Sequence, residues 1–329
     1  MPADRPGEFD LIARHFAPLS RGFPGAAGLK NDIAVISPPS GCDLIVKTDA
    51  IVAGVHFLVE DPPELVARKA LRVNLSDLAA GGGAPLAYQL ALALAPDWTE
   101  DWVARFCAGL AADQREFSVH LCGGDTVSTP GPLTISITAF GLVPSGEAMG
   151  RGGARAGDDV WVSGTIGDAA LGLRCLQGDG PTPAVEAKER DYLIERYRLP
   201  RPRLALAPWL RRMASASIDV SDGLVADLGH ICQVSGVGAA IEATAVPLSP
   251  PARRLVGGEP SLLPALMSAG DDYEILFTAS NDRRAEIEAL ARPLGFPLTR
   301  LGRIVAGASV SVLRFGIPLA IERSGYRHF

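Results

Sequence analysis

Aspartates at turns or at the ends of apolar runs are the residues of this 329-residue chain best suited to chemistry. They occur at Asn31-Asp32, Thr48-Asp49, Ser76-Asp77, Gly123-Gly124-Asp125-Thr126 and Asp219-Val220-Ser221-Asp222-Gly223. Several carboxylates in one cleft would repel one another unless a hard cation neutralised them. Mg²⁺ fits this need because it prefers carboxylate and phosphate oxygens and often bridges the phosphates of a nucleotide. We therefore expect one magnesium-binding cleft that gathers Asp32, Asp49, Asp77, Asp125, Asp219 and Asp222.

Each of these aspartates also has an ordinary interpretation. Asp222 could be the N-cap of a following helix, Asp125 could belong to a tight turn, and Asp32 and Asp49 are common turn residues. Asp219 is harder to explain in this way, because it interrupts an apolar strand run and needs a partner. The expected convergence of several carboxylates, rather than any single one, points to a metal.

Three other side chains have interpretations that stay open at this point. Arg151 lies in a Gly-dense stretch and could offer its guanidinium fork to phosphate oxygens, or be a solvated loop cation. His56 could be a packed or surface histidine, and Tyr326 could anchor a tail or cover a flat ligand ring. The sequence contains no P-loop, dinucleotide-binding, zincin or α/β-hydrolase signature, and its five histidines show no metal-ligand spacing.

Composition narrows the possible partners. The chain carries 31 Lys and Arg against 37 Asp and Glu, a formal charge of −6, which argues against a nucleic-acid surface. Apolar residues make up 47%, yet no run approaches the ~18 residues of a membrane span. The five cysteines form no C-x-x-C pair. A cytoplasmic protein without membrane or nucleic-acid partners is expected.

Short β-type runs interleave with amphipathic helices, a pattern typical of an α/β or α+β protein. Strands are predicted at 44–46, 133–143, 160–163, 217–220, 239–242, 273–278 and 310–314, and helices at 63–80, 100–117, 184–198, 201–213, 222–234 and 282–294. In the helix over 222–234, Leu224, Leu228, Ile231 and Cys232 form one apolar stripe toward a sheet. The Gly-dense stretch 150–157 indicates a junction, which predicts domains at 1–149 and 150–329.

The motifs together resemble those of bacterial thiamine-monophosphate kinases over essentially the whole chain. The resemblance rests on the aspartate motifs above and on Gly7-Glu8-Phe9-Asp10-Leu11-Ile12, Val52-Ala53-Gly54-Val55-His56-Phe57, Val73-Asn74-Leu75-Ser76-Asp77-Leu78, Ser163-Gly164-Thr165-Ile166-Gly167-Asp168 and Asp272-Tyr273-Glu274. It implies the two-domain fold of aminoimidazole-ribonucleotide and selenophosphate synthetases, with an N-terminal sheet that contributes to the barrel of a homodimer. It also implies transfer of the γ-phosphoryl group of ATP to thiamine monophosphate, giving thiamine diphosphate and ADP.

The resemblance assigns roles to particular residues of this chain. It implies that Asp32, Thr48, Asp49, Asp77, Asp125, Asp219 and Asp222 hold Mg²⁺. It implies that Gly124, Asp125, Arg151 and Ser221 contact ATP, and that His56, Asp271 and Tyr326 line the thiamine monophosphate site. Asp222, Asp125 and Arg151 are expected to be catalytic. Phosphoryl transfer mainly requires positioning and charge neutralisation, so Asp-held Mg²⁺ and one Arg suffice without a protein nucleophile.

The chain departs from the family pattern at three positions. Asn31 replaces a carboxylate of the usual Gly-Asp-Asp, Lys47 stands where Ser or Thr is usual, and Asp271 replaces Glu. Our hypothesis is that Lys47 and Asn31 lower the number or affinity of bound metal ions, with the lysine ammonium replacing part of a cation's role.

Three alternatives stay open at the sequence level. Another synthetase of the same superfamily would activate an amide or selenide with ATP, although Cys42, the first cysteine, lies just ahead of a strand rather than near the N-terminus. A silent homologue would bind nucleotide or thiamine phosphate as a sensor, and Asn31 and Lys47 motivate this alternative. A metal-dependent phosphatase would use similar aspartates but would not need Arg151.

Overall fold

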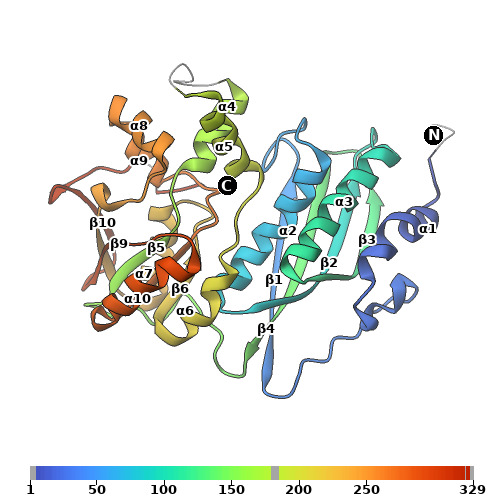
Figure 1. Ribbon diagram of the computed structural model, residues 1–329, viewed down its shortest axis with the longest axis horizontal. Helices are drawn as coiled ribbons and strands as arrows, with labels where there is room; N and C mark the ends of the chain where they lie inside the picture. The colour runs from blue at the N-terminus through green and yellow to red at the C-terminus, as the bar shows by residue number, and fades with distance from the viewer. Residues whose placement is uncertain (1–4, 179–184, 323, 327–329) are drawn as a thin grey trace. The chain divides into compact units, whose positions relative to one another are not determined.

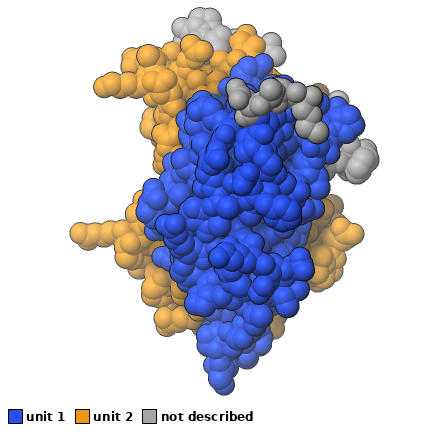
Figure 2. Space-filling view, turned by 90° about the vertical axis from the view of Figure 1, so that its right-hand side faces the viewer, with its two compact units in different colours: residues 1–78, 83–146 blue, residues 79–82, 147–329 orange. Residues whose placement is uncertain are grey.

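The computed structural model describes residues 5–178, 185–322 and 324–326, and the chain folds into two compact units. Unit 1 comprises residues 1–78 and 83–146, and unit 2 comprises residues 79–82 and 147–329 (Figure 2). The predicted junction at 149/150 lies three residues beyond the one between 146 and 147. Residues 79–82 belong to unit 2 because the backbone of Gly81 accepts a hydrogen bond from Met149 and that of Gly82 accepts one from Arg211.

Unit 1 contains a four-stranded sheet in the order β1-β4-β2-β3. Its strands are β1 (Cys42–Val52), β2 (Ala84–Leu94), β3 (His120–Ser128) and β4 (Thr134–Pro144). Strand β4 pairs antiparallel with β1 and β2, whereas β2 and β3 are parallel and joined through a helix. The strands β1 and β3 are therefore the two edges of this sheet.

Two long helices cover one face of this sheet, α2 (Pro63–Ala80) and α3 (Glu100–Phe117) (Figure 1). Both begin and end at the predicted residues. Leu71 and Leu75 of α2 and Phe106 of α3 are fully buried against sheet residues such as Leu92 and Ile137. Burial alternates along β1 and β4, as expected when only one face of a sheet is covered within the chain.

Short helical turns precede β1, and none of them was predicted. They are α1 (Glu8–Leu11), η1 (Ile12–Phe16), η2 (Ala17–Ser20) and η3 (Pro24–Leu29). Leu11, Phe16 and Leu19 are buried in the core of unit 1, so packing rather than helix length holds this segment in place.

Unit 2 has a seven-stranded mixed sheet in the order β11-β10-β7-β9-β5-β8-β6. Its strands are β5 (Asp159–Ser163), β6 (Ala214–Asp219), β7 (Gly238–Glu242), β8 (Ile275–Ala279), β9 (Leu298–Val305), β10 (Val310–Arg314) and β11 (Ile317–Pro318). Its helices are α4 (Asp168–Gln177), α5 (Ala187–Arg198), α6 (Ala207–Met213), α7 (Leu224–Ser235), α8 (Pro250–Gly258), α9 (Leu262–Met267) and α10 (Arg284–Leu294), with 3₁₀ turns η5 (Leu204–Leu206), η6 (Ala243–Ala245) and η7 (Asn281–Arg283).

The apolar stripe predicted for α7 is confirmed. Leu224, Leu228, Ile231 and Cys232 are all buried in one cluster with sheet residues such as Ile218. The fold class predicted from the sequence, a mixed α/β chain in two parts, is therefore confirmed. None of the described helices combines the length and the apolar character needed to cross a membrane.

Candidate active site

One group of predicted residues lies at the β1 edge of unit 1. Lys47 and Asp49 are two residues apart on β1 and therefore share a face, and Asp77 projects from α2. The Lys47 Nζ atom lies 3.1 Å from Asp49 Oδ1 and 3.0 Å from Asp77 Oδ2. Burial lowers the pKa of Lys47, but the carboxylates of Asp77 and Asp49 raise it by more, so the net shift is upward. The two carboxylates thus share one cation.

Buried polar residues of α2 fix the backbone around this group. The backbone N–H of Asp49 donates to Asn74 Oδ1 at 3.0 Å, and Asn74 is fully buried. Lys69, only 2% exposed, donates from Nζ to the carbonyl oxygen of His56 at 2.9 Å. The His56 Nδ1 atom accepts from the N–H of Val52 at 3.1 Å. Sequence reasoning missed Asn74 and Lys69 as positioning residues, although polar side chains inside an apolar helix pattern were a usable signal.

Thr48 lies on the opposite face of β1 from Asp49. Its Oγ1 atom is 2.8 Å from Thr138 Oγ1 on β4, which is its register partner. Successive side chains of a strand point to opposite faces, so adjacency in sequence separates these two side chains. Thr48 faces the open side of the sheet, and Asp49 faces the helices.

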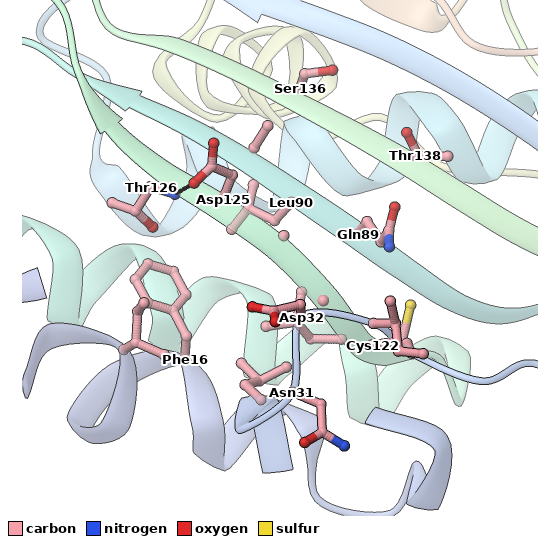
Figure 3. A pocket seen from close by; sticks show the side chains of 18 of the residues that line it. Phe16, Asn31, Asp32, Gln89, Leu90, Cys122, Asp125, Thr126, Ser136 and Thr138 are labelled. Atoms are coloured by element: carbon pink, nitrogen blue, oxygen red, sulfur yellow. Dashed lines mark hydrogen bonds between the residues drawn. The ribbon is translucent and has the colours of Figure 1, made fainter. Parts of the chain in front are cut away.

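A pocket of about 500 Å³ lies over the other edge of the sheet, at β3. Asn31 and Asp32 from the segment before β1 line it, together with Gln89, Gly124 and Asp125 (Figure 3). The Asp125 Oδ1 atom accepts a hydrogen bond from the N–H of Thr126 at 2.9 Å. This pocket combines carboxylate oxygens with exposed main chain.

Gly124 is required by close packing within the sheet. Its φ is +155°, and a Cβ atom there would lie 1.9 Å from the carbonyl oxygen of Leu90 on β2. The absence of a side chain lets β3 pair closely with β2 beside Asp125. The motif at 123–126 thus belongs to an edge strand that faces a pocket, and is more than a tight turn.

Unit 1 therefore divides its four predicted aspartates between two edges. In the register of the sheet, Asp49 pairs with Ile137, Ile137 with Leu90, and Leu90 with Gly124. Three strand spacings of about 4.8 Å make about 14 Å, and Asp49 and Asp125 also face opposite sides of the sheet. Within unit 1 of one copy, these residues therefore do not form a single cleft. Asp32 and Asp125 share one pocket, and Asp49 and Asp77 share another position.

The remaining predicted aspartates lie in unit 2, at the turn between β6 and α7. Asp219 ends β6 and is 2% exposed. The N–H groups of Ser221, Asp222 and Gly223 each donate to Asp227 Oδ2 at 3.1 Å. Gly223 is the N-cap of α7, and no side chain caps this helix. The interpretation of Asp222 as an N-cap is thus wrong, because Asp227 binds these N–H groups instead.

Asp227 is a further residue that holds main-chain groups in place and that sequence reasoning missed. Its side chain is 1% exposed, and burial, reinforced by the carboxylate of Asp222, raises its pKa to about 7. Oxygen or nitrogen atoms of Asp222, Asp227 and His230 all lie within 4.8 Å of one another. The neighbouring carboxylates of Asp222 and Asp227, like those of Asp49 and Asp77, repel each other and could be neutralised by a cation. The oxygen donors of both units therefore suit a hard ion such as Mg²⁺.

Two predicted substrate residues reach the same turn through main-chain hydrogen bonds. The N–H of Asp271 donates to the carbonyl oxygen of Ser221, and that of Tyr326 donates to the carbonyl oxygen of Asp222, both at 2.9 Å. Asp271 has φ +73°, a left-handed conformation that Asp tolerates better than Glu. Asp222, Tyr326 and His230 line a pocket of about 860 Å³.

Arg151, unlike Asp271 and Tyr326, makes no hydrogen bond to the 219–223 turn among those described for its main chain. It is exposed, and its carbonyl oxygen accepts from Ser235 Oγ at 3.3 Å, at the C-terminal end of α7. The preceding Gly150 pairs with Ser217 of β6. The structure thus places the Arg151 backbone beside β6 rather than in the 219–223 turn.

Comparison with known proteins places the chain among kinases. The family description "AIR synthase related protein" matches in two parts, its N-terminal domain over residues 30–143 and its C-terminal domain over residues 155–314. Thiamine-monophosphate kinases of Caulobacter vibrioides and Escherichia coli K12 are each 41% identical to this chain, over 98% of it and over 91% and 98% of their own lengths.

Solved structures agree. Thiamine-monophosphate kinase from Stenotrophomonas maltophilia K279a has a TM-score of 0.83 at 42% identity, covering 93% of this chain and 96% of its own. A structure described as AaThiL complexed with AMPPCP and TMP has a TM-score of 0.77 at 32% identity, covering 90% of each chain. The hydrogenase maturation protein HypE, at 20% identity and a TM-score of 0.76, shares the fold alone. The resemblance inferred from the motifs is confirmed, and the chain belongs to the thiamine-monophosphate kinase family.

Proposed function

We propose that this protein transfers the γ-phosphoryl group of ATP to thiamine monophosphate, giving thiamine diphosphate and ADP, with Mg²⁺ held by its aspartates. The observation that carries the proposal is the set of carboxylates at 32, 49, 77, 125, 219 and 222 in a chain whose near-full-length relatives at 41% identity are named thiamine-monophosphate kinases. A related structure contains AMPPCP and TMP, which supports ATP as the phosphoryl donor.

The chemistry asks little of the protein beyond position and charge. A terminal oxygen of the substrate phosphate, largely ionised at neutral pH, attacks the γ-phosphorus while the bond to the β–γ bridging oxygen breaks. ADP leaves with that electron pair, so no protein nucleophile is needed. When bound, Mg²⁺ offsets the charge on the transferring phosphoryl oxygens.

The roles of individual residues follow the family pattern. In this proposal Asp32, Thr48, Asp49, Asp77, Asp125, Asp219 and Asp222 serve the metal ions; Gly124, Asp125, Arg151 and Ser221 serve ATP; and His56, Asp271 and Tyr326 serve thiamine monophosphate. Gly124 and Asp125 line the pocket at β3, which suits a phosphate approaching exposed main chain. Asp271 and Tyr326 meet the 219–223 turn, which suits a second phosphate-bearing ligand.

We also propose a homodimer that completes each site. Asp49 and Asp125 lie at opposite edges of the unit 1 sheet, so shared metal ions would need one of them from a second copy. The face of this sheet that carries Thr48 and Asp125 exposes apolar side chains, with Val46 58% and Val127 48% exposed. If the β1 edge of one copy adjoins the β3 edge of the other, Asp49 and Asp125 meet across that seam. The open faces are then buried against each other, and the barrel that the family resemblance implies is formed.

A cytoplasmic location fits this activity, because ATP is supplied there and all five cysteines are free thiols. The decisive test of the reaction is to incubate the purified protein with ATP, Mg²⁺ and thiamine monophosphate, and to separate the products by chromatography. Thiamine diphosphate and ADP in equal amounts are expected. If inorganic phosphate forms and thiamine diphosphate does not, the protein is a phosphatase and the proposed kinase activity is wrong.

The dimeric site is tested by mixing two inactive variants, Asp49→Asn and Asp125→Asn. If each site takes these residues from different copies, random exchange of subunits leaves roughly a quarter of all sites intact. Activity near that fraction of wild type is expected after the two proteins are mixed, dissociated and reassembled. No recovery, with dimers present by analytical ultracentrifugation, would mean that both residues act within one copy.

A further inference from the structure

The Lys47 ammonium occupies the position between two carboxylates in which a metal ion would be expected. Its Nζ atom lies 3.1 Å from Asp49 Oδ1 and 3.0 Å from Asp77 Oδ2. We propose that Lys47 is a resident cation that takes the place of one divalent ion at this pair, so that the chain binds fewer such ions than a variant without this lysine. The inference rests on the proposed function, in which Asp49 and Asp77 serve magnesium.

The arrangement is built into the fold. Lys47 and Asp49 share a face of β1, and Asp77 faces them from α2, so three side chains on two elements converge. The hydrogen bond from the Asp49 N–H to buried Asn74 holds the strand against the helix at this level. The side chains of Lys47, Asp49 and Asp77 are 31%, 34% and 20% exposed, so solvent ions can reach them.

Charge decides between the ammonium and a metal ion. Two carboxylates and one ammonium leave a net charge of −1, so much of the attraction for a divalent ion is already satisfied. Mg²⁺ binds oxygen at about 2.0–2.1 Å and would have to bridge the same two oxygens, which places it against the ammonium. Like charges at such a distance repel strongly in a half-buried position. The lysine must leave before the ion can bind there.

The chain offers matched comparisons. Lys47→Ser removes the ammonium, Lys47→Arg keeps a positive charge, and Lys188→Ser removes an exposed lysine of α5 far along the chain. Lys47→Met keeps most of the aliphatic side chain and serves if the serine variant does not fold. In each protein, bound Mn²⁺ is counted by electron paramagnetic resonance and equilibrium dialysis, without nucleotide or substrate.

One additional Mn²⁺ per chain is expected for Lys47→Ser or Lys47→Met, and none for Lys47→Arg or Lys188→Ser. Adding Asp77→Asn to the Lys47→Ser protein should remove the gained ion. An unchanged count in Lys47→Ser and Lys47→Met, with only a lower melting temperature, would make Lys47 a structural clamp between β1 and α2 and would overturn the inference.

The count also separates this inference from the proposed function. A gained ion in a protein that makes no thiamine diphosphate would support the resident cation and overturn the kinase activity. A protein that makes thiamine diphosphate but gains no ion in Lys47→Ser would support the kinase activity and overturn the inference about Lys47.

Discussion

Asp227 offers a test of the site through pH alone. The substitution is Asp227→Asn, which keeps a carbonyl oxygen for the N–H groups of Ser221, Asp222 and Gly223 but cannot ionise. Asp282→Asn, on the exposed turn before α10, is the matched control. Both proteins are compared with wild type in urea unfolding at several pH values, with EDTA present to exclude metal ions.

The magnitude follows from the raised pKa of Asp227. In the folded protein this pKa is about 7, against 3.8 for an unperturbed aspartate. A difference of about three pH units, at about 1.36 kcal/mol each, corresponds to roughly 4 kcal/mol. Because the folded state holds the proton more tightly, this contribution is fully present below pH 3.8 and is lost as pH rises toward 7.

The free energy of unfolding of wild type relative to Asp227→Asn should therefore fall by roughly 4 kcal/mol between pH 4 and pH 8. Relative to Asp282→Asn it should stay nearly constant. A flat difference between wild type and Asp227→Asn would mean that Asp227 is ionised throughout this range. The account of Asp227 as a buried carboxyl group with a raised pKa would then be refuted.

Three further predictions concern unit 1. Gly124→Ala should lower the free energy of unfolding by about 2–3 kcal/mol in urea titrations, because its Cβ would meet the Leu90 carbonyl oxygen at 1.9 Å; wild-type stability would contradict the close pairing of β2 and β3. Asp125→Asn should reduce kcat by ~10²-fold or more with an unchanged circular dichroism spectrum; near-normal turnover would show that Asp125 is only a structural residue of β3. Lys69→Met should raise KM for thiamine monophosphate more than it lowers kcat, because the loop bearing His56 loses its anchor; an unchanged KM would remove His56 from the substrate site.

Local patterns in the sequence predicted the long elements well. The helices α2 and α3 and the stripe of Leu224 and Leu228 on α7 were predicted because apolar spacing dominates them. Strand β2 was missed because it contains one proline and four alanines, which are depleted in strands. Helix α8 was not predicted. It begins with Pro250 and Pro251, which suit a first helical turn, and Ser249 caps it.

The candidate site was predictable as a list of residues but not as an arrangement. The order of strands in a sheet is set by long-range pairing. Nothing near Asp49 or Asp125 in the sequence therefore indicates that β4 and β2 lie between the strands that carry them, β1 and β3. Buried partners such as Asn74 and Asp227 were missed for a related reason. Each of them binds main-chain groups, which every residue has, so no motif marks the partner.

The main-chain hydrogen bonds that join the 219–223 turn to Asp271 and Tyr326 bear on how this enzyme could evolve. Because main-chain N–H and carbonyl groups form these hydrogen bonds, the positions of the three segments do not depend on which side chains they carry. A change of side chain at position 271 therefore leaves the main-chain hydrogen bond to Ser221 in place, although the left-handed backbone there suits Asp better than Glu. In the proposed function, selection can thus vary the side chain at this position while the turn that carries Asp222 keeps its main-chain hydrogen bonds.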